Sequence, residues 1–175
     1  MRIIKKLFTI ETPIDALSIG MFDGVHTGHQ KIITKLKEKG LSAILTFENH
    51  PLTILQPEIA PQLICSLEER LSLLQTFGID IAIVIPFSAD LSKQPFDTFL
   101  EHIHSCLAFS HLILGDKAAF GFNRGGTPSL VKAFGAKHNF AVEYVTKDHI
   151  SSSSIRTAIQ ENKLSLAEKM LGRKL

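Results

Sequence analysis

Short apolar runs alternate with helix-like segments along most of the chain. The runs carry aliphatic side chains at successive positions, as expected of strands that are buried on both faces of a sheet. They lie at residues 16–22, 41–47, 79–86, 111–115 and 140–145. The helix-like segments between and after them lie at residues 27–39, 66–77, 95–107, 129–138, 151–161 and 165–171.

Two of the helix-like segments begin with recognisable start signals. Ser66 is followed three residues later by Glu69, which is the spacing of a capping box. Pro95 stands where the first turn of a helix tolerates a proline. Repeated alternation of strand and helix predicts an α/β fold with helices on both faces of a parallel sheet. Right-handed crossovers then give a Rossmann-like, doubly wound sheet of five parallel strands, in one domain over residues 1–175.

The fold class predicts where a site should lie. Ligands of a doubly wound sheet bind beyond the carboxyl ends of its strands. We therefore expect the functional loops to follow Met21, Phe47, Pro86, Leu114 and Val145.

The bulk composition narrows the class of protein. Hydrophobic residues make up 45% of the chain and charged residues 21%, which is average for a folded domain and argues against general disorder. The formal net charge of +2 is too small for a nucleic-acid-binding surface. No apolar stretch approaches the roughly 20 residues that span a bilayer, and no signal-peptide pattern follows Met1. We expect a cytoplasmic protein without membrane or nucleic-acid partners.

The cysteines and most of the histidines carry no motif. Cys65 and Cys106 lack metal-ligand spacing and are expected to be ordinary thiols. Surface positions are expected for His102, His104, His111, His138 and His149.

The segment 20–29 has the features of an anion-binding helix start. Asp23 and Gly24 predict a tight turn, after which Thr27 opens a helix. The first N–H groups of a helix have no partner within it and lie at the positive end of its dipole, so they attract anions. We expect this turn and helix start to bind a phosphate chain.

Two histidines strengthen this expectation. His26 and His29 are three residues apart, so on a helix start they share one face, and Gly28 between them lets an anion approach the backbone. Imidazoles titrate near neutral pH, so both can donate to phosphate oxygens and become cationic as charge develops. A metal pair or two ordinary surface histidines are the alternatives. Zinc is disfavoured because no cysteine or third ligand lies nearby.

The serine run 151–154 is a second candidate anion site. Serines are common helix N-caps, and capping alone explains one of them. Four in succession, with Arg156 one turn into the helix, indicate hydroxyl and N–H groups that hold phosphate oxygens beside a forked guanidinium contact. In a doubly wound sheet this run lies near the first helix start, so both can bind one triphosphate.

The pattern GxFDGxHxGH at residues 20–29, together with ISSxxIR at residues 150–156, resembles the adenylyltransferase domain of bacterial FAD synthetases, within the HxGH nucleotidyltransferases. Further segments that resemble this family are residues 46–51, the Gly-rich stretch 115–126, and residues 167–173. The HxGH motif alone also fits transfer to other acceptors, whereas the extended motif and the later segments narrow the resemblance to FMN. The resemblance implies the HxGH nucleotidyltransferase fold and an enzyme that forms FAD and pyrophosphate from ATP and FMN.

The resemblance also implies roles for individual residues. The FMN phosphate would attack the α-phosphorus of ATP in line without a covalent enzyme intermediate, and Mg2+ would be bound through the ATP phosphates. His26, His29 and Arg156 would be catalytic. ATP contacts are implied for Gly20, Phe22, Asp23, Gly24, Gly28, Ser151, Ser152 and Ser153. FMN contacts are implied for Phe47, Glu48, His50, Pro51, Asp116, Lys117, Phe120, Asn123 and Arg124.

The chain departs from the family pattern mainly on the flavin side. Lys117 replaces a carboxylate or amide and Ala118 replaces a phenylalanine, so Lys117 is either a phosphate contact or a solvated side chain. Phe120 is either an acceptor contact or part of the core. A nucleotidyltransferase with another phosphorylated acceptor, or a catalytically silent nucleotide or flavin sensor, is the alternative to an FMN adenylyltransferase. No segment resembles a riboflavin kinase, so we expect a separate riboflavin kinase to supply FMN, unless the chain is an excised domain.

Overall fold

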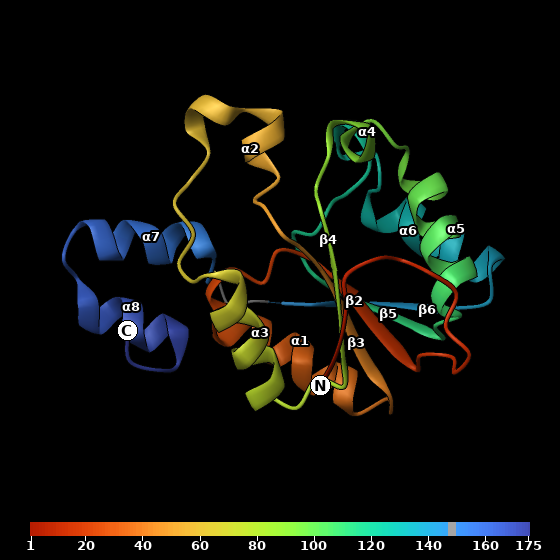
Figure 1. Ribbon diagram of the computed structural model, residues 1–175, viewed down its shortest axis with the longest axis horizontal. Helices are drawn as coiled ribbons and strands as arrows, with labels where there is room; N and C mark the ends of the chain where they lie inside the picture. Colours follow the sequence, from red (N-terminus) through yellow and green to blue (C-terminus); the bar gives the residue numbers. More distant parts are fainter. Residues whose placement is uncertain (147–149) are drawn as a thin grey trace.

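The computed structural model describes residues 1–146 and 150–175 and is built on a parallel β-sheet (Figure 1). Its strands are β1 (Arg2–Ile4), β2 (Ala16–Ile19), β3 (Ser42–Phe47), β4 (Ile81–Ile85), β5 (His111–Gly115) and β6 (Ala141–Val145). The predicted α/β fold with a parallel, Rossmann-like sheet is confirmed. The surface position expected for His149 lies outside the described residues.

The strand order explains where a ligand should bind. The strands lie in the order β1-β4-β3-β2-β5-β6. The chain runs outward from β2 through β3 to β4, and then returns to the other side of β2 to form β5 and β6. The carboxyl ends of β2 and β5 therefore flank the point at which the order reverses, which is where sheets of this kind bind ligands.

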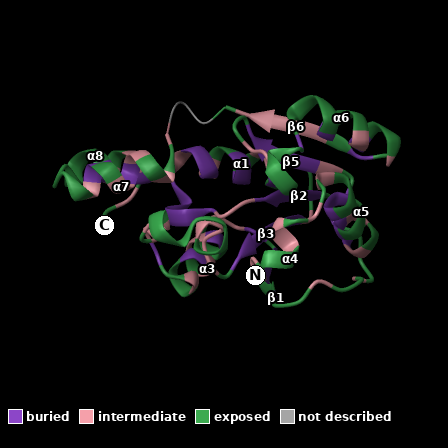
Figure 2. Ribbon diagram, turned by 90° about the horizontal axis from the view of Figure 1, so that it is seen from above, coloured by how far each residue is buried: buried purple, intermediate pink, exposed green. Residues whose placement is uncertain are grey.

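Helices cover both faces of the sheet (Figure 1). The longer ones are α1 (Thr27–Lys37), α3 (Leu67–Thr76), α5 (Phe96–Leu107) and α6 (Pro128–Lys137). Neighbouring positions on a strand face different cores, since Ile44 packs with α1 and α3 whereas Leu45 packs with α5 and α6. Figure 2 shows that buried residues concentrate on the central strands and on α1. Burial on both faces accounts for the continuous apolar runs in the sequence.

The predicted number of five strands is wrong, because β1 adds a sixth. This strand has three residues and pairs with β4 at the edge of the sheet, and Ile4 is its buried residue. Two lysines follow it directly, so the segment is too short and too polar to give a periodic signal. Pairing with a neighbouring strand, rather than local pattern, makes it a strand.

The helix predictions hold for the longer elements. Ser66 and Glu69 form the predicted capping box at the start of α3. Pro95 precedes α5 as its N-cap and does not lie in the first turn. The sequence pattern does not predict the short helical turns η1 (Asp23–Val25), α2 (Leu52–Leu55), η2 (Pro57–Ile59), α4 (Ala89–Ser92) and η3 (Phe122–Arg124).

The last two helices, α7 (Ser152–Gln160) and α8 (Leu164–Leu171), form a hairpin to one side of the sheet (Figure 1). Its buried residues form a small cluster of their own, Ile155, Ala158, Ala167 and Leu171. Within the described residues, no helix has the length and apolar character needed to cross a membrane.

Candidate functional site

Segments that are far apart in the sequence meet at the carboxyl ends of β2 and β5. A cavity of about 140 Å3 lies there. Its lining residues are His26, His29, Asp116, Lys117, Ile150, Ser151 and Ser152. The histidines follow β2, the Asp-Lys pair follows β5, and the serines begin α7. The structure thus joins the histidine motif, the serine run and the start of the Gly-rich loop in one site.

The turn that leads from β2 into α1 has an unusual backbone. Phe22, Gly24 and Val25 have φ values of 51°, 76° and 41°, in the left-handed region. That region suits glycine but strains a β-branched residue such as valine. A Cβ atom at Gly24 would also approach Ile64 to 3.0 Å and Leu171 to 3.2 Å. The turn therefore requires glycine at this position and contacts from elsewhere that hold its shape.

His26 and His29 are almost completely buried, with exposed fractions of 1% and 7%. Their rings stack with centroids 3.7 Å apart, so the two side chains share one face as predicted. His26 is the N-cap of α1, and its Nδ1 accepts a hydrogen bond from the backbone N–H of His29 at 3.3 Å. A neutral His26 therefore carries its proton on Nε2 and can donate from that atom. The N–H group of His29 is one of those at the helix start that were expected to bind an anion. In this structure it donates to the His26 side chain instead.

Asp23 connects the turn to two other segments. Its carboxylate is 2% exposed and forms an ion pair with Arg156 at 2.8 Å. The same carboxylate accepts a hydrogen bond from the backbone N–H of Ile64 at 2.9 Å. The hydroxyl of Ser152 donates to the Asp23 backbone carbonyl at 3.0 Å. Asp23 thus fixes the start of α7 and the residues before α3 against the turn.

The other serines of the run also form hydrogen bonds within the protein. Ser151 caps α7 in a reciprocal capping box with Ser154. Ser153 accepts a hydrogen bond from Arg156 at 3.3 Å. Ser151 and Ser152 line the cavity, whereas Arg156 is joined to the turn through Asp23. The arrangement offers a polyanion hydroxyl groups, imidazole donors and an oriented guanidinium within one small region.

The end of the C-terminal hairpin binds the same turn. Arg173 donates a hydrogen bond to the carbonyl of Gly24 at 2.7 Å. The Gln30 side chain of α1 donates to the carbonyl of Leu171 at 2.9 Å. Arg173 and Gly24 are 149 positions apart in the sequence, so no local pattern could reveal their contact. These bonds help to hold the strained turn in place.

The residues predicted to bind FMN after β3 lie outside the cavity. Phe47, the last residue of β3, is buried and packs edge-on against Phe87 with centroids 5.4 Å apart. Glu48 is exposed, and His50 and Pro51 are half-buried. Among the described residues, these four are not part of the cavity lining.

His50 nevertheless lies within electrostatic reach of Arg156 and Asp23. Its Nδ1 accepts a hydrogen bond from the Leu52 N–H at 3.1 Å, at the start of α2. Burial lowers the pKa of His50, and the positive charge of Arg156 lowers it further, while Asp23 acts in the opposite direction. The neutral ring is thus the favoured form, and its acceptor nitrogen helps to begin the short helix.

The Gly-rich loop contributes only its first residues to the cavity. Asp116 and Lys117 are exposed and line it. Asn123 and Arg124 are exposed farther along the loop, outside the lining. Phe120 is half-buried, and its ring lies 6.1 Å from a phenylalanine ring of α5, which fits the alternative that it is part of the core.

One charged residue at this edge of the sheet is not apparent from the motifs. Arg70 of α3 is fully buried, and its guanidinium donates to the carbonyls of Met21 and Phe47. A sequence signal does exist, because Arg70 lies four residues before Leu74 and so on the apolar side of the predicted helix.

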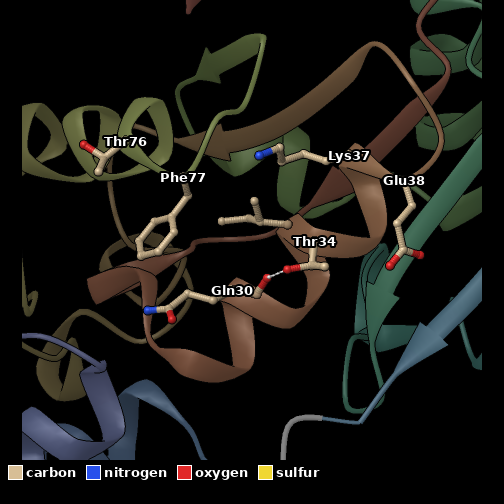
Figure 3. A pocket seen from close by; sticks show the side chains of 7 residues that line it. Gln30, Thr34, Lys37, Glu38, Thr76 and Phe77 are labelled. Atoms are coloured by element: carbon tan, nitrogen blue, oxygen red, sulfur yellow. Dashed lines mark hydrogen bonds between the residues drawn. The ribbon is translucent and has the colours of Figure 1, made fainter.

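A larger groove, of about 640 Å3, lies between α1 and α3 (Figure 3). It is lined by Gln30, Ile33, Thr34, Lys37, Glu38, Thr76 and Phe77. Both helices end at the amino edge of the sheet, away from the strand ends that hold the histidines, so this groove is not the predicted site. Among the described residues, no group of three or more His, Cys, Asp or Glu side chains is placed to hold a metal ion.

Comparisons with known proteins fit this geometry. A family model described as FAD synthetase matches residues 11–158. The chain is 36% identical over 170 residues to the bifunctional riboflavin kinase/FMN adenylyltransferase of Buchnera aphidicola subsp. Schizaphis graminum. The aligned region covers 90% of this chain and 54% of that protein. The chain spans about half the length of the curated relatives it matches.

Solved structures show the same architecture. A macrolide-efflux protein from Streptococcus pneumoniae matches with a TM-score of 0.84 at 26% identity, over 99% of this chain and 60% of that one. A pantoate-beta-alanine ligase from Francisella tularensis matches with a TM-score of 0.57 at 14% identity, over 83% of this chain and 67% of that one. At this identity the second likeness concerns the fold alone.

Proposed function

This chain belongs to the FAD synthetase family, and from that premise we propose that it transfers the AMP group of ATP to FMN, forming FAD and pyrophosphate. The curated relatives are named as FMN adenylyltransferases joined to a riboflavin kinase. The proposal assigns this chain the first of those activities and treats residues 1–175 as one domain of the HxGH nucleotidyltransferase type.

The observation that carries the proposal is the meeting of two histidines with two serines and a lysine in one cavity at the switch point of the sheet. The phosphate of FMN is already an anion, so the reaction requires alignment and neutralisation of charge more than a general base. An oxygen of that phosphate forms a bond to the α-phosphorus of ATP. The bond from the α-phosphorus to the bridging oxygen breaks, and pyrophosphate leaves with the electron pair.

Each phosphate-side residue has a role that suits its contacts. His26 and His29, buried and stacked, would donate to the reacting phosphates where a low dielectric strengthens such bonds. Arg156, oriented by Asp23, would balance the charge of the leaving pyrophosphate. Ser152, bound to the turn, would hold an outer phosphate together with Ser151 and Ser153. The remaining ATP contacts, Gly20, Phe22, Gly24 and Gly28, would shape the turn that receives it.

On the acceptor side, Lys117 is proposed to contact the FMN phosphate, because it is a cation on the wall of the cavity. Contacts from Phe47, Glu48, His50, Pro51, Asp116, Phe120, Asn123 and Arg124 to FMN stay predictions. We propose that Mg2+ enters bound to the ATP phosphates, since it prefers phosphate oxygens and water to an all-protein cage. We also propose a cytoplasmic location.

A chromatographic assay tests the proposal directly. Purified protein is incubated with ATP, Mg2+ and either FMN or riboflavin, and the flavins are separated. We expect FAD from FMN and none from riboflavin. Absence of FAD with FMN, in protein that still binds ATP by calorimetry, would contradict the proposed acceptor.

A further inference from the structure

Arg70 lies completely inside the protein, beneath the edge of the sheet where the cavity opens. Its exposed fraction is 0%, and Asp23 is the other charged residue that is buried among those described. One guanidinium nitrogen, Nη1, donates to the Met21 carbonyl at 2.8 Å and to the Phe47 carbonyl at 2.9 Å. It also donates to the hydroxyl of Thr46 at 2.9 Å. A single side chain from α3 thus ties together the carboxyl ends of β2 and β3.

The two strand ends lead to different parts of the proposed site. Met21 precedes the strained turn and the histidine motif, which form the ATP side. Phe47 precedes the segment with Glu48 and His50, which is predicted to bind FMN. The relative position of the two substrates therefore depends on the spacing of these strand ends. The Thr46 hydroxyl joins them by donating to the Met21 carbonyl at 3.0 Å, and Arg70 adds a second link that reaches Met21, Thr46 and Phe47.

The environment of Arg70 is costly for a residue with a purely structural role. Its Nε and Nη2 atoms are buried and, among the described residues, have no hydrogen-bond partner. In the same part of the chain no carboxylate forms an ion pair with it, because that of Asp23 pairs with Arg156 and acts on Arg70 only at longer range. An apolar side chain of similar size would fill the same space without burying an uncompensated charge. The burial also lowers the pKa of Arg70, although an arginine stays protonated.

We propose that Arg70 is a positioning residue for adenylyl transfer, which fixes the ATP-side and FMN-side strand ends in the spacing needed for in-line attack. This inference rests on the proposed function. Its buried positive charge also lies on the side of the sheet where the proposed reaction gathers several phosphate groups. Arg70 itself touches neither substrate in this arrangement, so its effect is exerted through Met21 and Phe47.

The test compares Arg70→Met, Arg70→Lys and the control Lys35→Met, which removes an exposed cation from α1. For Arg70→Met we expect the turnover number per folded molecule to fall roughly 100-fold, since misplacement of about 1 Å has effects of that size. The dissociation constants of ATP alone and FMN alone should change less than about 3-fold, because each strand end keeps its own contacts. Arg70→Lys keeps the positive charge and part of the hydrogen bonding, so its turnover number should lie between those of Arg70→Met and the wild type.

Hydrogen exchange gives a readout that does not depend on turnover. Amides in the peptides covering residues 20–29 and 46–51 should exchange faster in Arg70→Met, while those of β5 and β6 stay unchanged. Unchanged turnover per folded molecule with a lowered melting temperature would overturn the proposal, and so would equal losses in turnover and in both binding constants. If Arg70→Met does not fold, Arg70→Lys with unaltered turnover and exchange would overturn it as well. Wild-type protein that forms no FAD would contradict the proposed function, whereas the exchange result would still judge the role of Arg70.

Discussion

The two halves of the site are built very differently. On the side proposed to bind ATP, Phe22, Asp23, His26 and His29 are all less than 8% exposed, and Asp23 is bound to other segments through both its side chain and its carbonyl. On the side proposed to bind the acceptor, the loop from Asp116 to Arg124 is mostly exposed, and its Asp116 and Phe122 N–H groups donate to the carbonyls of Val145 and Gln94.

This difference matches what each half has to do. Donors that stabilise a developing charge are effective only if they are held in place before the reaction, and folding supplies that order on the ATP side. The strained backbone of Phe22 and Val25 is tolerated because neighbouring segments bind it. A large acceptor needs an open approach, and an exposed loop provides one. The following predictions test this contrast, beginning with the largest expected effect.

Removing one buried donor should affect catalysis most. His29→Ala deletes an imidazole from the cavity, and we expect turnover to fall roughly 100- to 1,000-fold. ATP binding should weaken far less, because the donor acts mainly in the transition state. Steady-state kinetics and calorimetry on the same preparations separate the two effects. His102→Ala is the matched control, since His102 is exposed on α5, and equal losses in turnover and ATP affinity would make His29 a binding residue only.

Loosening the turn from outside should have an intermediate effect. Arg173→Met removes the donor to the Gly24 carbonyl, and we expect the free energy of unfolding to drop by about 1–2 kcal/mol. Turnover should fall roughly 10-fold, because the turn positions His26 and its neighbours. Urea denaturation and the FAD assay measure the two quantities. The neighbouring Lys174→Met, which alters an exposed side chain, should change neither, and full turnover in Arg173→Met would show that the turn holds its shape without this bond.

The same contrast explains what the sequence could reveal. Strands β2 to β6, the longer helices and the histidine motif were predictable, because apolar runs, capping signals and the spacing of His26 and His29 are local features. The fold class also placed the serine run and Arg156 near the first helix start. The individual bonds from Arg156 to Asp23 and from Arg173 to Gly24 were not predictable, because they join residues more than 130 positions apart. Strand β1 escaped prediction for the same reason, since it exists through pairing with β4.

Reversing a charge on the open side should alter acceptor affinity without reaching the chemistry. For Lys117→Asp we expect the Michaelis constant for FMN to rise roughly 5- to 10-fold, with turnover at saturating FMN almost unchanged. Lys5→Asp serves as the control, because Lys5 is exposed next to the edge strand β1, on the far side of the sheet from β5. An unaltered Michaelis constant in Lys117→Asp would leave Lys117 as a solvated side chain.

The smallest effect should be a pH dependence of stability that originates at His50. Its pKa in the folded protein is lowered below 6.5, so the unfolded chain binds the proton more readily than the folded one. The contribution of His50 to stability is therefore complete above pH 6.5 and should decline as the pH falls from 6.5 towards the folded pKa, because the unfolded chain takes up a proton that burial and Arg156 disfavour in the folded protein. Urea denaturation of wild type and His50→Asn across this range measures the effect, and the variant should show a shallower decline. Parallel declines in the two proteins would assign the acid sensitivity to other groups. A shallower decline in the variant would assign that part of the acid sensitivity to His50.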